Sequence, residues 1–183
     1  MATKHDLLST LRSVQAGSIS PEEALLQMKL APFEDLGYAK VDYHRAVRQG
    51  ASEVIYGQSK TPEHIAGILE AMQRRDSSNI LVTRIEQKTA DWLAERFPLR
   101  YEPLAKLAVV LPRPTEQRGA IAVITGGTSD IGVAEEAAIT AETLGNRVTR
   151  LYDVGVAGLH RLLSQLEPLM KARVVVAVAG MEG

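Results

Sequence analysis

A glycine-rich turn at the start of the last third of the chain has the residue types needed to bind and act on a phosphorylated ligand. It runs from residue 125 to residue 132 and contains two adjacent glycines, a serine and an aspartate. Because it follows the apolar run 120–125 and opens a helical pattern, we expect it at the carboxyl end of a strand, where open α/β sheets bind ligands. Glycines let the backbone approach a ligand closely, and free N–H groups at a helix start favour anions.

Three interpretations of this turn are open from the residues alone. The simplest is a tight strand-to-helix connection in which Ser129 caps the helix. The second is a dinucleotide-binding turn, because the string resembles the glycine pattern of short-chain dehydrogenases and Asp153 ends the next expected strand, where a ribose-binding acid would stand. Asp130 argues against it, since that family needs glycine at this position and a carboxylate would repel the pyrophosphate.

The third interpretation gives Asp130 a working role. The turn resembles the Gly-Ser-x-Ser-Asp turn of the aminoimidazole ribonucleotide carboxylase and mutase family of purine biosynthesis, in which the serine and aspartate hold the ribose phosphate and the substrate. Ser129 and Asp130 are the matching positions. Backbone N–H groups would bind phosphate, and the carboxylate would bind a hydroxyl group or a cationic ring.

The elements before residue 112 predict a helical hairpin followed by alternating strands and helices. Leucine spacing over 5–16 and the Ser20-Pro21 start signal predict the hairpin, and Asp42 is expected to cap a short helix that Gly50 ends. The expected strands are 52–56, 79–83 and 107–111, and the expected helices start at residue 61 and cover 89–97. The residues expected in the core of these helices are Ile65, Ile68, Leu69, Met72, Trp92 and Phe97.

The elements after residue 118 predict a parallel sheet. The proline-bounded polar segment 112–118 is the expected domain boundary. Beyond it, three apolar strands alternate with two helices, and strands this apolar are usually covered on both faces. The expected strands are 120–125, 148–152 and 173–179, and the expected helices are 129–144 and 156–171. In the first of these helices the residues expected to face inward are Val133, Ala137, Ala141 and Leu144.

The sequence therefore predicts an α/β fold with two domains. Residues 1–111 form a small N-terminal α/β domain with its leading hairpin, and residues 119–183 form the first part of a flavodoxin-like open parallel-sheet domain. Because only three strands are supplied before residue 183, we expect the chain to be truncated at its C-terminus relative to its family.

Composition narrows the possible partners. The formal charge of −1 and a pI near 6.4 provide no field that would gather nucleic acid or a membrane surface. The chain has no cysteine, and its histidines show no metal-ligand spacing. With no apolar leader or membrane-length run, the cytoplasm is the expected location.

Several short motifs together resemble one family over nearly the whole chain. In order they are Asp42-x-x-Arg45-x-x-Arg48-x-Gly50, residues 52–57, Lys60-Thr61, Thr83-Arg84, Asp153-x-Gly155-x-x-Gly158 and residues 179–183. This combination is similar to the nickel-pincer-cofactor biosynthesis protein B family, the pyridinium-biscarboxylic acid mononucleotide synthases. The second domain of that family resembles the purine carboxylases.

The resemblance implies an enzyme that adds carbon dioxide to the pyridinium ring of nicotinic acid adenine dinucleotide and cleaves its phosphoanhydride to release AMP. It implies a homo-oligomer, an octamer, with no certain cofactor, although a divalent metal is compatible with it. Ser129, Asp130 and Glu182 would lie in the active site. The other ligand-binding positions would be Gly126, Gly127, Thr128, Asp153 and Gly155.

The chain departs from the related families in two respects. The purine enzymes place a catalytic Ala-His-Arg at the end of their second strand, whereas His160-Arg161 falls within the following expected helix, where a surface role is an equal alternative. The nickel-pincer family uses a cysteine that adds to the ring, since a pyridinium cannot attack carbon dioxide until a nucleophile has added to it. We expect that cysteine in a missing C-terminal part.

Two other functions stay open, and so do the roles of several charged residues. An aminoimidazole ribonucleotide carboxylase needs no thiol, and a non-catalytic nucleotide-binding module needs no chemistry. Four cations have two open roles: they either reach a ligand phosphate or carboxylate across the domain interface or are solvated. They are Arg45, Arg48, Lys60 and Arg84. Glu135 and Glu136 are expected on an exposed helix face, whereas Glu182 follows a strand end on the ligand side.

Overall fold

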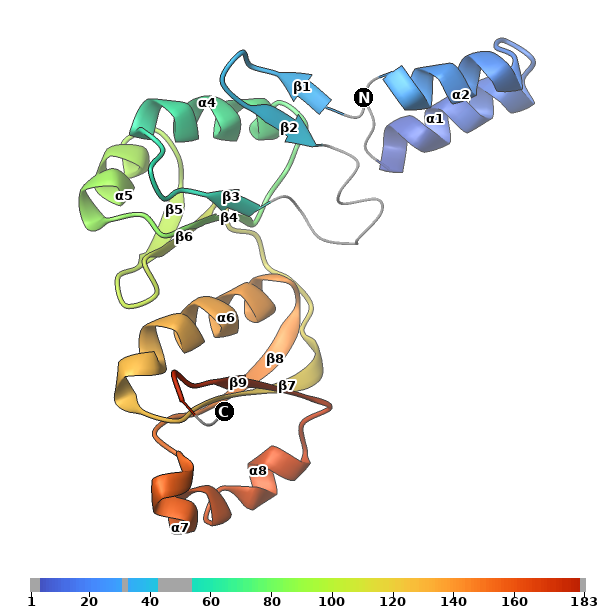
Figure 1. Cartoon of the computed structure of the whole chain (residues 1–183). Coiled ribbons are helices and arrows are strands. Elements are labelled where there is room, and N and C mark those ends of the chain that lie inside the picture. Colours follow the sequence, from blue (N-terminus) through green and yellow to red (C-terminus); the bar gives the residue numbers. More distant parts are fainter. Residues whose placement is uncertain (1–3, 31–32, 43–53, 182–183) are drawn as a thin grey trace.

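Two β-sheets with helices between and around them make up the body of the protein (Figure 1). The computed structural model describes residues 4–30, 33–42 and 54–181. Most of the helix expected from Asp42 to Gly50 lies outside these residues, and Asp42 itself ends a strand.

The N-terminal hairpin has the expected helices, α1 (Lys4–Gln15) and α2 (Pro21–Leu30). The start of α2 is a reciprocal capping box. The Glu23 N–H donates to Ser20 Oγ at 3.0 Å, and the Ser20 N–H donates to Glu23 Oε2 at 2.8 Å. These two bonds explain why the second helix begins at Pro21.

The first sheet of the body is four-stranded and mixed, with strand order β3-β4-β6-β5. Its members are β3 (Val54–Tyr56), β4 (Ile80–Thr83), β5 (Leu99–Glu102) and β6 (Leu107–Val110). The strands β3 and β4 are parallel and are joined by α4 (Pro62–Gln73), whereas β6 runs antiparallel to β4 and β5. The following helix, α5 (Gln87–Ala94), is shorter than expected.

The sequence patterns missed the short antiparallel pair β1 (Phe33–Asp35) and β2 (Lys40–Asp42) and the edge strand β5. These strands carry polar side chains and are too short to show alternation. The expected core is confirmed, because α4 and α5 cover one face of the first sheet with buried residues. Phe97 is buried in this cluster, and Trp92 packs against it.

The second sheet is parallel and has strand order β8-β7-β9. Its strands are β7 (Arg118–Thr125), β8 (Asn146–Leu151) and β9 (Val174–Val178). The first strand in the chain lies in the centre, with the second and third on either side, which is the order in which flavodoxin-like sheets begin. The helix α6 (Ile131–Thr143) connects β7 to β8.

The expected single helix over 156–171 is broken into three pieces. They are a 3-10 turn η2 (Val156–Gly158) and two short helices, α7 (Leu159–Leu163) and α8 (Leu166–Met170). Pro168 explains the break between α7 and α8, because in a continuous helix its ring would clash with the carbonyl group four residues earlier, at Ser164, and it cannot donate a hydrogen bond there.

The helix α6 lies between the two sheets, so that the body is a stack of layers (Figure 1). Ile139 belongs to a buried cluster with residues of the first sheet and the loop before β6. Ala134 and Ala138 pack against Val123 of the second sheet. The inward face expected for this helix is therefore wrong: Val133 is 58% exposed and Leu144 is 46% exposed. A helix buried on two opposite faces does not show a single apolar stripe.

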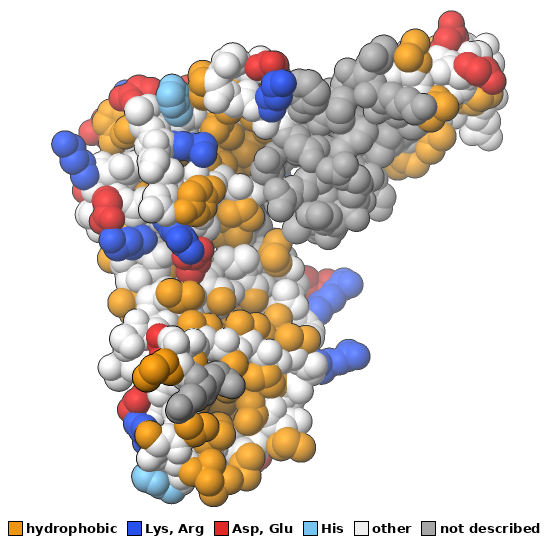
Figure 2. Space-filling model, in the orientation of Figure 1, with side chains coloured by type: hydrophobic (Ala, Val, Ile, Leu, Met, Phe, Trp, Pro, Cys, Tyr) orange, Lys and Arg blue, Asp and Glu red, His pale blue; other side chains and the backbone are white. Residues whose placement is uncertain are grey.

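The prediction of an α/β fold is confirmed by the mixed first sheet and the parallel second sheet. Apolar side chains are exposed on α7, α8 and β9 of the C-terminal part (Figure 2). The proposed division into domains 1–111 and 119–183 stays a prediction, since α6 contacts both sheets.

Candidate functional site

The glycine turn holds the carboxylate of Asp130 over its own backbone. The strand β7 ends at the fully buried Thr125, and a single 3-10 turn η1 (Thr128–Asp130) leads into α6. The N–H of Gly127 donates to Asp130 Oδ2 at 3.2 Å. The N–H of Gly126 donates to the Val178 carbonyl oxygen at 3.1 Å, which ties the turn to the end of β9.

Three glycines border this carboxylate. A Cβ atom placed on Gly126 or Gly127 would lie 3.9 or 3.8 Å from Asp130 Oδ2, and one on Gly180 would lie 3.8 Å from Oδ1. Asp130 is half-buried. The negative charge therefore lies at the carboxyl ends of β7 and β9, where the strand order reverses and where such sheets bind ligands.

Ser129 does not act as the helix cap that the simplest interpretation required. The residue before α6 is Asp130, and neither η1 nor α6 has a side-chain cap from Ser129. Ser129 and Thr128 are both exposed. The Ser129 hydroxyl makes no hydrogen bond with the part of the chain that the structure describes, so it is free to meet a ligand.

The segment after β8 is fastened to the glycine turn. The Asp153 N–H donates to Thr125 Oγ1 at 2.9 Å, and the Val154 N–H donates to the Thr125 carbonyl oxygen at 3.0 Å. A Cβ atom on Gly155 would overlap the carbonyl oxygen of Gly126 and lie 3.1 Å from its carbonyl carbon. Gly155 therefore lets the two loops meet, and the carboxylate of Asp153 pairs with the guanidinium of Arg161.

A charged network that the sequence patterns do not predict fixes β8 against α6. Arg150 Nη1 and Nη2 bind the carboxylate of Glu142, and Arg150 Nε lies 3.1 Å from Glu135 Oε2. The Tyr152 hydroxyl donates to Glu135 Oε1 at 2.7 Å. Burial, together with the hydrogen bond to Glu135, raises the pKa of Tyr152 to about 12. The hydrogen bond to Glu142, ahead of that to Glu135, raises the pKa of Arg150.

The expectation that Glu135 and Glu136 form an exposed helix face is wrong. Their side chains are 19% and 27% exposed, and both carboxylates face a cation. The residue spacing indicates which of these side chains share a face. Glu135 and Glu142 are two helical turns apart, and Arg150 and Tyr152 are two residues apart, as on one face of an extended chain.

In the described part of the chain, neither Arg84 nor Lys60 bonds to the glycine turn. Arg84 follows β4 with a φ of 56°, and its guanidinium carbon lies 5.5 Å from the centre of the Tyr56 ring. Its Nε lies 3.9 Å from Glu136 Oε2 on α6. Lys60 is exposed just before α4. Arg45, Arg48 and Glu182 lie outside the described residues, and their roles stay predictions.

Two hollows flank the loop after β8. A small apolar pocket of about 100 Å³ lies between the ligand end of the sheet and α7, lined by residues including Gly126, Val154, Leu162 and Ala179. A wider groove of about 490 Å³ with both polar and apolar walls runs beside Tyr152 and Asp153, and His160 and Arg161 line it. In the described residues, His160-Arg161 thus lies on α7 at the groove and not on the glycine turn.

Among the residues with described positions, no group of three or more histidine, aspartate or glutamate side chains is arranged to hold a metal ion. In the same residues, no helix has the length and apolar character that crossing a membrane would require.

The fold and the turn define a class of protein: an α/β protein whose parallel sheet presents a glycine turn and a carboxylate where strand order reverses. Comparison with known proteins identifies the family within this class. Residues 33–112 match the model of the LarB/PurE-like N-terminal domain. An uncharacterized protein of Methanocaldococcus jannaschii is 34% identical over 190 residues, covering 97% of this chain and 73% of the relative.

The chain therefore belongs to the LarB/PurE-like family. The matched domain comprises the β1-β2 pair and the first sheet with α4 and α5, and the similarity to the archaeal relative continues through the glycine turn. Membership supports, in broad terms, a carboxylase- or mutase-type enzyme of this family.

Proposed function

We propose that the protein carboxylates the pyridinium ring of nicotinic acid adenine dinucleotide and hydrolyses its phosphoanhydride to release AMP, as the first step of nickel-pincer cofactor biosynthesis. Family membership supports the proposal in general. The observation that carries it is the position of the Asp130 carboxylate over the glycines at the carboxyl ends of β7 and β9.

The charge at this position favours a particular ligand. A carboxylate there attracts a cationic ring. It also repels a diphosphate placed directly on the glycines, which is where dehydrogenases bind the diphosphate of their cofactor. A pyridinium is a cationic ring. Asp130 would orient this ring, and the exposed hydroxyl of Ser129 would bind a phosphate or ribose hydroxyl.

Ring carboxylation needs a nucleophile. In the proposed reaction a thiolate adds to the pyridinium and forms an enamine, whose carbon attacks carbon dioxide; loss of the ring proton and of the thiolate then restores the aromatic ring. None of the 183 residues is a cysteine. The assay uses the protein expressed from its full reading frame.

The test supplies that protein with nicotinic acid adenine dinucleotide and labelled bicarbonate. The proposal predicts that label enters the pyridine product and that AMP is released with it, and that Asp130→Asn abolishes both. If neither product forms while the folded protein is present, the proposal is wrong.

The absence of cysteine favours a second candidate, an aminoimidazole ribonucleotide carboxylase, whose electron-rich substrate needs no thiol. Complementation of a purine auxotroph tests it. Growth would support this candidate against the first. A bound nucleotide with no turnover in either assay would instead support a nucleotide-binding module without catalysis.

Two further expectations belong to the proposal. A dinucleotide substrate and carbon dioxide would be met in the cytoplasm. The assembly proposed from the family resemblance is an octamer, and light scattering of the full-length protein measures it directly. A monomer at assay concentration would contradict this part.

A further inference from the structure

The helix α6 carries the Asp130 turn at its start, and one stripe of this helix faces the first sheet. Gly132, Glu136 and Ile139 are spaced as positions i, i+4 and i+7, which lie on one side of a helix. Each of the three contacts the N-terminal part of the protein. The opposite side of the helix, with Ala134 and Ala138, packs against the second sheet.

The contact of Ile139 is apolar and closed to solvent. Ile139 is 4% exposed, and its cluster combines β4, β6 and the loop before β6. The other members of this cluster are Leu81, Ala105, Leu107 and Val109. These residues are on the face of the first sheet opposite α4 and α5, which explains why all four residues of β4 are buried.

The contact of Gly132 is made by backbone, two residues after Asp130. A Cβ atom at Gly132 would lie 3.0 Å from the Leu104 carbonyl oxygen in the loop between β5 and β6. This loop is itself held in place, because the Ile85 N–H donates to the Lys106 carbonyl oxygen at 2.9 Å. The loop thus rests on the first turn of α6, directly behind the candidate ligand turn.

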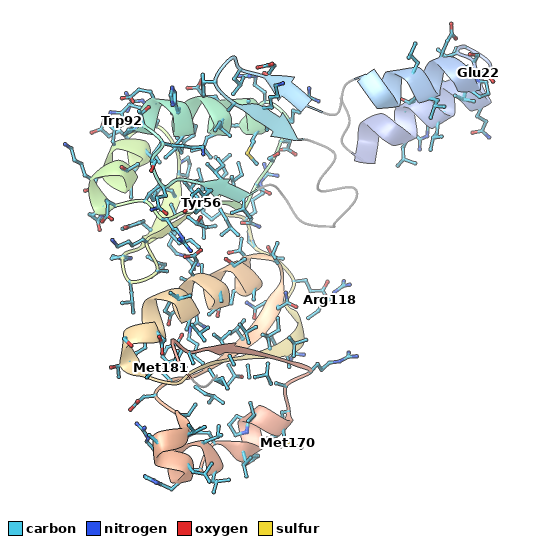
Figure 3. All side chains as sticks on the ribbon, in the orientation of Figure 1. Glu22, Tyr56, Trp92, Arg118, Met170 and Met181 are labelled. Atoms are coloured by element: carbon cyan, nitrogen blue, oxygen red, sulfur yellow. The ribbon has the colours of Figure 1, made fainter. Side chains whose placement is uncertain are left out.

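The contact of Glu136 is electrostatic. Arg84 Nε lies 3.9 Å from Glu136 Oε2, and the Arg84 guanidinium lies over Tyr56, which Figure 3 labels at the end of β3. Arg84 has a left-handed backbone, which is uncommon for a residue other than glycine. Arg84 is thus placed by the ends of two strands of the first sheet and directed at α6.

We infer that the N-terminal α/β unit, residues 33–42 and 54–111, is a positioning element of the ligand site. It fixes α6 through Gly132, Glu136 and Ile139, and thereby fixes the Asp130 turn. A helix moves nearly as a rigid rod, so a shift at this stripe is transmitted to Asp130. By linkage, a ligand that orders the turn also strengthens the docking of the unit on α6. The inference rests on the proposed site at the turn, but not on the reaction proposed for it.

The first experiment needs no ligand. Amide hydrogen exchange over residues 126–131 is measured by mass spectrometry for the full-length wild type, Ile139→Ala and Val133→Ala. We expect Ile139→Ala to speed exchange at the turn by about tenfold, a shift within the usual range of coupling between sites. Val133 is exposed on the same helical turn as Gly132 but faces solvent, so Val133→Ala should leave the exchange unchanged. Equal exchange in all three proteins overturns the inference.

A charge-reversal cycle covers the case in which Ile139→Ala does not fold. Arg84→Glu and Glu136→Arg each replace attraction by repulsion, whereas the double variant restores an ion pair in the reverse sense. For each single variant we expect exchange at the turn to rise, and the Kd for nicotinic acid adenine dinucleotide to weaken, by up to about fivefold, which matches a partly exposed pair. The double variant should recover wild-type values, and Lys88→Glu on α5 serves as the control for added negative charge.

The outcomes separate this inference from the proposed function. Faster exchange in the single variants with rescue in the double supports positioning even if no carboxylation is found. Wild-type exchange and Kd in both single variants overturn it even if carboxylation is confirmed.

Discussion

Replacing Gly155 by alanine tests the closest approach between the two loops of the candidate site. The backbone of Gly155 has φ −60° and ψ 156°, which any residue can adopt, so the substitution causes no conformational strain of its own. The added methyl group would overlap the carbonyl oxygen of Gly126 and lie 3.1 and 3.3 Å from its carbonyl carbon and Cα. The effect is therefore purely steric, and backbone is the part that has to move.

The expected magnitude follows from this overlap. Carbon and oxygen need a separation of about 3.3 Å or more, so one loop has to move by about 1 Å. Overpacking of this kind costs about 1–3 kcal/mol. For a chain of this size each kcal/mol lowers the Tm by about 2–4 °C, so Gly155→Ala should unfold about 2–12 °C below the wild type. Since a displacement of 1 Å in a site can cost up to about 100-fold in rate, turnover should fall by more than the loss of stability suggests.

The assay is thermal unfolding by circular dichroism, with Gly127→Ala as the matched control for stability. Gly127 has an extended backbone, and a methyl group there would meet its nearest atoms at 3.8 and 3.9 Å, which is ordinary contact. If both variants unfold at the same temperature, the close packing of the two loops does not have the importance assigned to it.

Three further predictions follow from the site and the fold. Asp130→Asn should keep the Tm within about 2 °C of the wild type, since the asparagine oxygen can still accept a hydrogen bond from the Gly127 N–H. The same variant should lose ligand-dependent turnover, and retained turnover in a steady-state assay would contradict the role of the carboxylate. The pKa of Tyr152 is about 12 in the folded protein and should fall toward the ordinary value of 10.0 in Glu135→Gln, as measured by ultraviolet absorbance; an unchanged titration would contradict the assigned hydrogen bond. Because the folded pKa is the higher one, this tyrosine stabilises the fold below pH 10 and loses that contribution as the pH rises toward 12. Pro168→Ala should remove the clash at Ser164 and join α7 to α8, with an increase in helical circular dichroism; an unchanged spectrum would locate the cause of the break elsewhere.

The sequence predicted the fold class and most strands because apolar runs flanked by glycine and proline are local signals. It predicted the α4 core for the same reason, since Ile65, Ile68, Leu69 and Met72 recur at helical spacing. It could not predict that α6 is covered by both sheets. This arrangement depends on contacts such as Ile139 with Leu107, which are distant in the chain.

The candidate site shows the same limit. The glycine turn and its aspartate were visible as a motif, but the direction of the Asp130 side chain is set by the Gly127 N–H and by the end of β9. The helical pattern predicts a solvated face for Glu135 because its partners, Arg150 on β8 and Tyr152 just after it, are distant in the chain. The spacing of these residues shows which of them share a face, but not which faces meet.

The proposed function requires above all that Asp130 faces a cationic ring. The direct measurement is the Kd of the full-length protein for nicotinic acid adenine dinucleotide and for its reduced form, whose dihydropyridine ring carries no positive charge. We predict that the wild type prefers the charged ring by about tenfold or more, a difference of about 1.4 kcal/mol, and that Asp130→Asn removes this preference. Equal affinity of the wild type for the two forms, or a preference that survives in Asp130→Asn, would contradict the account.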